Sequence, residues 1–237
     1  MALSIAIRAA YLTCFLAQAA YGQDQDSAAA ANPPDALPKR ILGIIPNYRT
    51  APSLAHCQPL TAKGKFKIAA EDSFEPGTFA LTGMIAGEAQ LAHSTPSFGQ
   101  EESGYARYFG TTYGNLAIGN FMREAIYPSL LHQDPRYFRR GTGSAWSRVG
   151  YAMSQIFWTH TDSGGSTFNF SEVLGSATAA AISDAYYPGR RTATNFASKL
   201  SIQLGVGTAG NLLKEFWPDL DRKFRHKDRA TPSPPGK

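Results

Sequence analysis

Cysteine is scarce in this chain, which excludes several kinds of site. The sequence of 237 residues holds two cysteines, Cys14 and Cys57. Cys14 falls in an apolar N-terminal stretch that we expect to be removed, and the residues before it lack the small side chains of a lipoprotein box. The remaining thiol cannot form an intramolecular disulfide or a cysteine-rich zinc site. Since only the adjacent His56 is close to it in sequence, we expect Cys57 to be an ordinary loop side chain.

Blocks of like charge and long apolar runs are also missing. The 23 basic residues are interleaved with 18 acidic ones, for a net charge of +5. Without a Lys/Arg block to hold nucleic-acid phosphates, we expect no nucleic-acid partner. No segment reaches the roughly 18 uninterrupted apolar residues that indicate a spanning helix, because charges such as Arg123, Asp184 and Lys199 intervene. We therefore expect no membrane-spanning helices.

The short motifs of metal, phosphate and nucleophile chemistry are absent as well. The sequence contains no His-Glu-x-x-His, no Glu-x-x-His and no Gly-Lys-Ser/Thr. The loop at 159–166 groups His160, Asp162 and two serines. However, the members of a catalytic triad meet across a fold, and neither serine lies in a Gly-x-Ser-x-Gly turn. We predict no metal site and no cofactor.

The first 22 residues have the layout of a secretory signal peptide. Arg8 precedes an apolar run at 9–17, and a small-x-small cleavage site follows at 20–22. The run would span only ~15 Å, half of a bilayer core, so a cleaved leader is preferred to a membrane anchor. Residues 23–39 lack an apolar period and predict a flexible linker. We expect export to the periplasm or the periphery of the outer membrane.

Proline and glycine divide the rest of the chain into helices. Residues 40–71 hold a short apolar run followed by prolines, which predicts an extended segment packed on the main body. A helical domain should cover 72–221, and the tail at 222–237 is predicted to be disordered. The expected helices are at residues 72–93, 102–131, 144–160, 169–187 and 192–217. The predicted fold is all-α, an antiparallel bundle of about five helices.

Specific residues mark the helix ends. Asp72 and Glu75 have the spacing of a capping box for the first helix. Ser144 and Asn169 are expected to cap the third and fourth helices. Pro218 is expected to interrupt the last.

Small residues recur at four-residue spacing within the predicted helices. The sets are Gly83 and Gly87; Gly110, Gly114 and Ala117 or Ile118; Gly175 and Ala179; Gly205 and Ala209. Positions four apart lie on one helix face, so each set forms a smooth stripe. Because a helical glycine costs about 0.5–1 kcal/mol relative to alanine, we expect close packing along these seams to compensate.

The densest polar group lies in the loop at 132–141. It contains His132, Asp134, Arg136, Arg139 and Arg140. Guanidinium groups can hold phosphate or carboxylate oxygens in pairs, and histidine can exchange protons near neutral pH. These five residues are the candidate site for an anionic group. The simpler interpretation is structural, with the aspartate capping local N–H groups and the arginines pairing with helix carbonyls.

Single charges also occur on the predicted helices. Glu88, Glu124, Glu172 and Asp184 each stand in apolar surroundings, as does Arg123. Facing carboxylates could form an acid/base or two-metal site. We expect buried ion pairs between helices instead, such as Arg123 with a carboxylate from another helix.

Four distinctive strings carry a resemblance. They lie at 44–48 (IIPNY), 132–139 (HQDPRYFR), 167–172 (TFNFSE) and 214–219 (KEFWPD). On these strings, the stretch from 40 to 219 resembles a group of uncharacterised exported proteins of soil bacteria, of the acidobacterial type. The resemblance implies an exported protein and carries over no activity.

The preferred functional hypothesis is a non-enzymatic helical protein associated with a membrane surface or an envelope complex. Mixtures of aromatic and basic residues at 137–140 and 216–225 favour contact with a membrane surface. The alternative is a hydrolase acting on an envelope lipid or phosphoester through the loop at 132–140. The sequence leaves the oligomeric state open.

Overall fold

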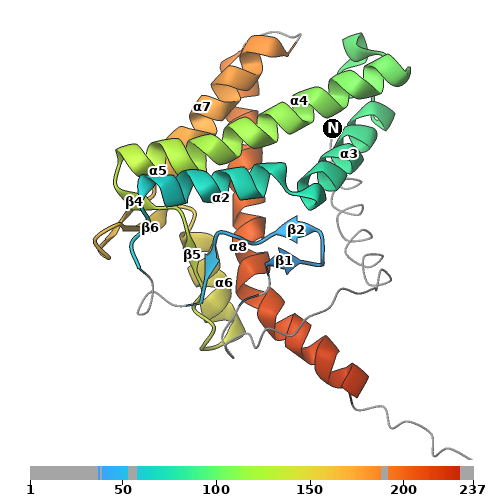
Figure 1. The fold of residues 1–237 in the computed structure, drawn as a ribbon. Coiled ribbons are helices and arrows are strands. Elements are labelled where there is room, and N and C mark those ends of the chain that lie inside the picture. The colour runs from blue at the N-terminus through green and yellow to red at the C-terminus, as the bar shows by residue number, and fades with distance from the viewer. Residues whose placement is uncertain (1–36, 38, 53–57, 188–191, 230–237) are drawn as a thin grey trace, which may run out of the picture.

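The computed structural model describes residues 37, 39–52, 58–187 and 192–229 (Figure 1). The predicted signal peptide at 1–22, nearly all of the linker at 23–39 and Cys57 lie outside the described residues. No helix in the described part is long and apolar enough to cross a membrane.

The chain is mostly helical, as the sequence predicts, and it also contains short strands. The main helices are α2 (Ala62–Phe74), α3 (Pro76–Leu91), α4 (Glu102–Asn120), α6 (Ala145–Ser154), α7 (Phe170–Tyr186) and α8 (Ala193–Arg229). The shorter ones are the 3₁₀ helix η2 (Pro96–Phe98), the π-helical η3 (Phe121–Ile126) and α5 (Tyr127–Leu130). In Figure 1, α2 and α4 lie side by side, and α8 crosses behind them. A single antiparallel bundle of five helices is not confirmed.

The strands connect loops that are far apart in the sequence. A hairpin joins β1 (Arg40–Ile41) to β2 (Ile45–Pro46), and β3 (Thr50–Ala51) pairs in parallel with β5 (Tyr137–Phe138). A second, antiparallel sheet has the order β4 (Gln133–Asp134), β6 (Trp158–Thr161) and β7 (Ser166–Phe168). These pairings hold the loop at 132–141 between β3 of the N-terminal segment and β6.

The first predicted helix starts ten residues earlier than the expected position 72. Helix α2 begins at Ala62, inside the segment predicted to be extended, because the Thr61 side chain accepts a hydrogen bond from the Gly64 N–H at 3.2 Å. Asp72 therefore lies in the last turn of α2 and forms no capping box. A second helix, α3, starts at Pro76, whose missing N–H costs nothing in a first turn.

Two later helices end elsewhere than the sequence predicts. Helix α6 starts at the cap Ser144 as expected but ends at Ser154, because Trp158–Thr161 forms a strand that pairs with both β4 and β7. Helix α8 continues through Pro218 to Arg229, so residues 222–229 are helical rather than disordered. Arg139 and Arg148 both donate to the carbonyl oxygen of Glu215, in the turn that the proline weakens.

The interior is unusually polar. Lys65 on α2 is only 1 % exposed, and its ammonium donates to the Pro128 carbonyl at 3.0 Å and to the Asp162 carboxylate at 2.7 Å. A small apolar cluster of Ala86, Phe98 and Tyr108 lies at the other end of the fold. Hydrogen bonds and ion pairs therefore hold much of the interior together.

Only some of the small-residue stripes lie in close contact with a neighbouring element. A Cβ on Gly175 would lie 2.8 Å from the Arg123 Cγ, so α7 and η3 approach closely there. A Cβ on Gly110 or Gly205 would meet nothing within 4 Å among the described residues. The expected seam is thus confirmed at Gly175 and wrong at Gly110 and Gly205.

Candidate functional site

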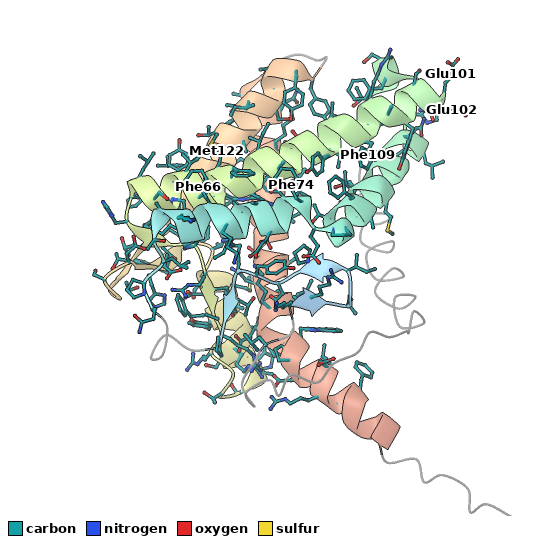
Figure 2. All side chains as sticks on the ribbon, in the orientation of Figure 1. Phe66, Phe74, Glu101, Glu102, Phe109 and Met122 are labelled. Carbon is teal, nitrogen blue, oxygen red and sulfur yellow. The ribbon has the colours of Figure 1, made fainter. Side chains whose placement is uncertain are left out.

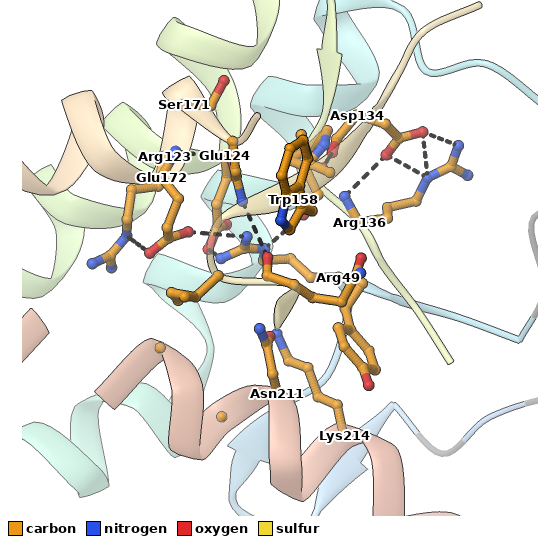
Figure 3. Close-up of a pocket in the computed structure, with 18 of the residues that line it drawn as sticks. Arg49, Arg123, Glu124, Asp134, Arg136, Trp158, Ser171, Glu172, Asn211 and Lys214 are labelled. Atoms are coloured by element: carbon orange, nitrogen blue, oxygen red, sulfur yellow. Dashed lines mark hydrogen bonds and ion pairs between the residues drawn. The ribbon is translucent and has the colours of Figure 1, made fainter. Parts of the chain in front are cut away.

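A charged cavity of about 130 Å³ lies where η3, α7, α8 and the β4–β6 pair meet (Figure 3). The π-helical turn η3 supplies Arg123 and Glu124, and the first turn of α7 supplies Glu172. A π-helical turn inserted in a longer helix often marks a functional site. The cavity is therefore the candidate site of the described residues.

Arg49 enters the cavity from the segment just before β3. Pairing of β3 with β5 brings it beside the loop, where its Nε donates to the Pro135 carbonyl at 3.0 Å. Its guanidinium lies 3.1 Å from the Glu124 carboxylate and 3.6 Å from that of Glu172. Burial by itself would lower the pKa of Arg49, but the two carboxylates outweigh it and raise the pKa.

Glu172 is held by its helix end and by a second arginine. Asn169 caps α7, accepting from the Glu172 N–H at 3.1 Å. The Arg123 Nε lies 3.8 Å from the Glu172 carboxylate, so the predicted pairing of Arg123 with a carboxylate on another helix is confirmed. The same Nε makes no hydrogen bond within the described part of the chain.

Asp72 and Lys214 have strongly shifted pKa values. Burial, and then repulsion from Glu124, raises the pKa of Asp72 well above that of an ordinary carboxyl group. Burial, and then repulsion from Arg49, lowers the pKa of Lys214 below that of an ordinary lysine. Lys214 lines the cavity, and no hydrogen bond or ion pair joins it to another described residue.

Glu215 follows Lys214 on α8, but unlike Lys214 it has a full set of hydrogen-bond partners. Its fully buried carboxylate accepts hydrogen bonds from the Tyr137 hydroxyl at 2.8 Å, the Arg148 Nε at 2.7 Å, and the N–H groups of Arg140 and Gly141. Burial opposes ionisation, but these donors, led by Arg148, lower its pKa. Such a fully paired carboxylate has a structural role, since it has no capacity left for a ligand.

The five predicted site residues do not gather in one pocket. Asp134 and Arg136 line the cavity but bind each other, with the guanidinium 2.6 Å from the carboxylate. His132 is 84 % exposed on its side chain and lies 3.9 Å from the Asp162 carboxylate. Arg139 pairs with the Glu215 carbonyl and Asp219, and the Arg140 guanidinium lies over the Tyr151 ring. Binding of an anion by this loop as a whole stays a prediction.

The loop at 159–166 belongs to the β6–β7 hairpin, so residues 158–160 are not the end of a helix as predicted. His160 packs edge-on against Phe138, and burial lowers its pKa. Asp162 instead bonds Lys65, so the two residues are engaged with different partners.

Sequence reasoning missed Arg49 and Lys214 as parts of the site, and it missed Asp72 as a charge that acts on Lys214. A signal was nevertheless present, because all four distinctive strings contribute to this region or lie directly beside it. The string at 44–48 ends beside Arg49, and the last one begins at Lys214. Strings far apart in sequence that meet in space indicate a shared site.

No family model, curated protein or solved structure matches this chain.

Proposed function

We propose that this chain is a non-enzymatic, exported helical protein of the cell envelope that binds an anionic membrane surface. The binding surface is an aromatic face on α2, α3, α4 and η3, made of Phe66, Phe74, Phe79, Tyr105, Phe109, Tyr113 and Phe121. The observation that carries the proposal is that these helices expose large aromatic side chains, among them Phe66, Phe74, Phe79 and Tyr105.

Several buried residues of these helices are small and polar, although Ile68, Ala69, Ala86 and Tyr108 are buried as well. Ser73, Thr78 and Thr82 are buried, whereas Phe74 is 60 % exposed and Leu91 is 83 % exposed. On a surface helix of an ordinary globular protein, large apolar side chains such as these face the core. An exposed apolar patch of this kind favours an interaction surface.

Figure 2 shows Phe66 and Phe74 on α2 and Phe109 on the neighbouring α4. Phe121 contacts both Phe66 and Phe74, at ring-centre distances of 6.4 and 6.5 Å. Tyr113 contacts Phe79 at 4.9 Å and Phe109 at 6.4 Å. Aromatic side chains of this sort suit the boundary between lipid and water.

Charge favours an anionic lipid surface as the occupant. Lys63 and Lys67 are exposed on either side of Phe66 on α2. Each lysine near an anionic bilayer adds about 1 kcal/mol of attraction. An amphipathic helix with basic and aromatic residues can lie in the interface without spanning it.

The experiment is flotation of the mature protein with vesicles of neutral lipid, alone or mixed with an anionic lipid. We expect binding to the anionic vesicles. The double variant Phe66→Ser, Phe74→Ser should bind at least about tenfold more weakly, because each buried phenylalanine contributes about 1.5–3 kcal/mol. Trp146→Ser is the matched control: it removes a still more exposed aromatic from α6, away from the α2–α4 layer (Figure 1).

Two outcomes would contradict the proposal. One is a wild-type protein that stays with the soluble fraction at every lipid composition. The other is a solution dimer that the Phe66→Ser, Phe74→Ser variant dissociates, with no vesicle binding, since the face would then belong to a second copy.

The proposal of export rests on the sequence at 1–22, and it is tested separately from membrane binding. We propose location in the periplasm or at the periphery of the outer membrane. Mass spectrometry of the protein from cell fractions should find a mature chain beginning at Gln23. The hydrolase alternative gains no support, because His132 does not line the cavity with Arg136.

A further inference from the structure

One of the basic residues that line the cavity has no hydrogen bond or ion pair with another described residue. Its lining carries four basic residues, Arg49, Arg123, Arg136 and Lys214, against the carboxylates of Asp134, Glu124 and Glu172. Arg136 is matched by Asp134, and the other two arginines by the two glutamates. Lys214 makes no ion pair of this kind, although the charges of Asp72, Glu124 and Glu172 act on it and raise its pKa against the effect of burial.

Helix α8 leaves open space beside this lysine. Gly207, Gly210 and Lys214 follow at a spacing that places them on one helix face, and all three line the cavity. A Cβ on Gly210 would meet nothing within 4 Å among the described residues. The ammonium group therefore borders a volume that a ligand could fill.

The mouth of the cavity is apolar, in contrast to its charged interior. Trp158 is 52 % exposed, Val206 is 67 % exposed, and both line the cavity together with Ile156. In Figure 3, Trp158 lies opposite the helix that carries Asn211 and Lys214. A ligand that uses both parts needs an anionic head and a short hydrocarbon chain.

The volume limits the size of that ligand. An engineered protein cavity of about 150 Å³ holds one benzene molecule, so about 130 Å³ suits a ligand of roughly six non-hydrogen atoms. Short-chain carboxylates have this size. Phosphate would fit the charge but would leave the apolar mouth unused.

We propose that this cavity is a binding site for a short-chain carboxylate, with Lys214 as its counter-ion and the hydrocarbon chain between Trp158 and Val206. The Arg123 Nε–H, which lies 3.8 Å from the Glu172 carboxylate and makes no hydrogen bond within the described residues, supplies a further donor. The site is independent of the aromatic face, so vesicle binding and carboxylate binding can fail separately.

The test is a titration of the full mature protein with ¹³C-labelled butyrate, followed by NMR. We expect saturable binding to the wild type and at least about tenfold weaker binding to Lys214→Met, since a hydrogen bond to a charged group is lost. Butanol, which has the chain without the charge, should not bind. Inorganic phosphate should bind more weakly than butyrate.

Two further variants separate binding from folding. Gly210→Val fills the space beside the lysine without changing any charge, and it should also abolish butyrate binding. Lys199→Met removes a lysine that pairs with Asp184 outside the cavity, and it should leave butyrate binding unchanged. Thermal unfolding of each variant verifies that it is folded, and Lys214→Met should not lower the melting temperature because no ion pair is lost.

Several results would overturn the proposal. Unchanged butyrate affinity in a folded Lys214→Met or Gly210→Val protein would do so. Butanol binding as tightly as butyrate would remove the role of the charge. Phosphate binding more tightly than butyrate would remove the role of the apolar mouth.

Discussion

Replacing Glu215 by glutamine should destabilise the protein more than any surface substitution. The glutamate carboxylate is 0 % exposed and accepts four hydrogen bonds, from Tyr137, Arg148 and the backbone of Arg140 and Gly141. Glutamine has nearly the same shape, so packing is preserved. Its amide NH₂ group is a donor, however, and would face donors, while the Arg148 guanidinium would lose one of its carboxylates.

The expected loss of stability follows from the burial of the ion pair between Glu215 and Arg148. Removing one partner of a buried ion pair costs about 3–5 kcal/mol, because the other charge is left uncompensated. Arg148 keeps Asp219 at 2.7 Å, which favours the lower end, about 3 kcal/mol. For a chain of this size, each kcal/mol lowers the melting temperature by about 2–4 °C, so we expect a shift of roughly 6–12 °C.

The assay is urea-induced unfolding followed by circular dichroism, supported by calorimetry. Glu71→Gln is the matched control, since Glu71 pairs only loosely with Lys67, at 3.7 Å on the surface. That variant should change the free energy of unfolding by less than about 0.5 kcal/mol. The reasoning is refuted if Glu215→Gln loses less than about 1 kcal/mol or matches Glu71→Gln.

The same residue makes a prediction about pH. Because folding lowers the pKa of Glu215, its contribution is fully present above the ordinary glutamate pKa of ~4.3 and is lost as the pH falls through the lower, folded value. The stability difference between wild type and Glu215→Gln should therefore be constant from about pH 6 to 8 and shrink below about pH 4. A difference that grows on acidification would contradict this assignment.

Two further predictions concern the helices. Gly175→Ala should lower the free energy of unfolding by about 1–3 kcal/mol, because its Cβ would lie 2.8 Å from the Arg123 Cγ. Gly205→Ala adds a methyl group in open space and should raise the free energy of unfolding by about 0.5–1 kcal/mol. Urea unfolding that gives both changes the same sign would refute this packing. Asn169→Ala removes the cap of α7 and should lower the stability of the protein by about 0.5–2 kcal/mol, measured by thermal unfolding. An unchanged stability would show that the Glu172 N–H does not need this hydrogen-bond acceptor.

Local sequence signals predicted the helices whose ends depend on nearby residues. Ser144 and Asn169 cap α6 and α7 as expected, because a side-chain oxygen and an N–H three residues on interact within a single turn. Predictions were wrong where a side chain interacts with a residue far away in the sequence. Asp72 and Glu75 have capping-box spacing, yet Asp72 is directed to Glu124 and Lys214, on other helices.

The sequence by itself determined that the chain is mainly helical and where several helices begin, since capping and proline placement act over one turn. It also marked four strings, three of which supply residues that line the cavity. Only the tertiary structure decided that Trp158–Thr161 is a strand, that Arg49 meets Glu124, and that the loop arginines are divided between Asp134, Glu215 and Asp219. Those contacts join residues far apart along the chain, and no local periodicity encodes which distant charge a side chain will meet.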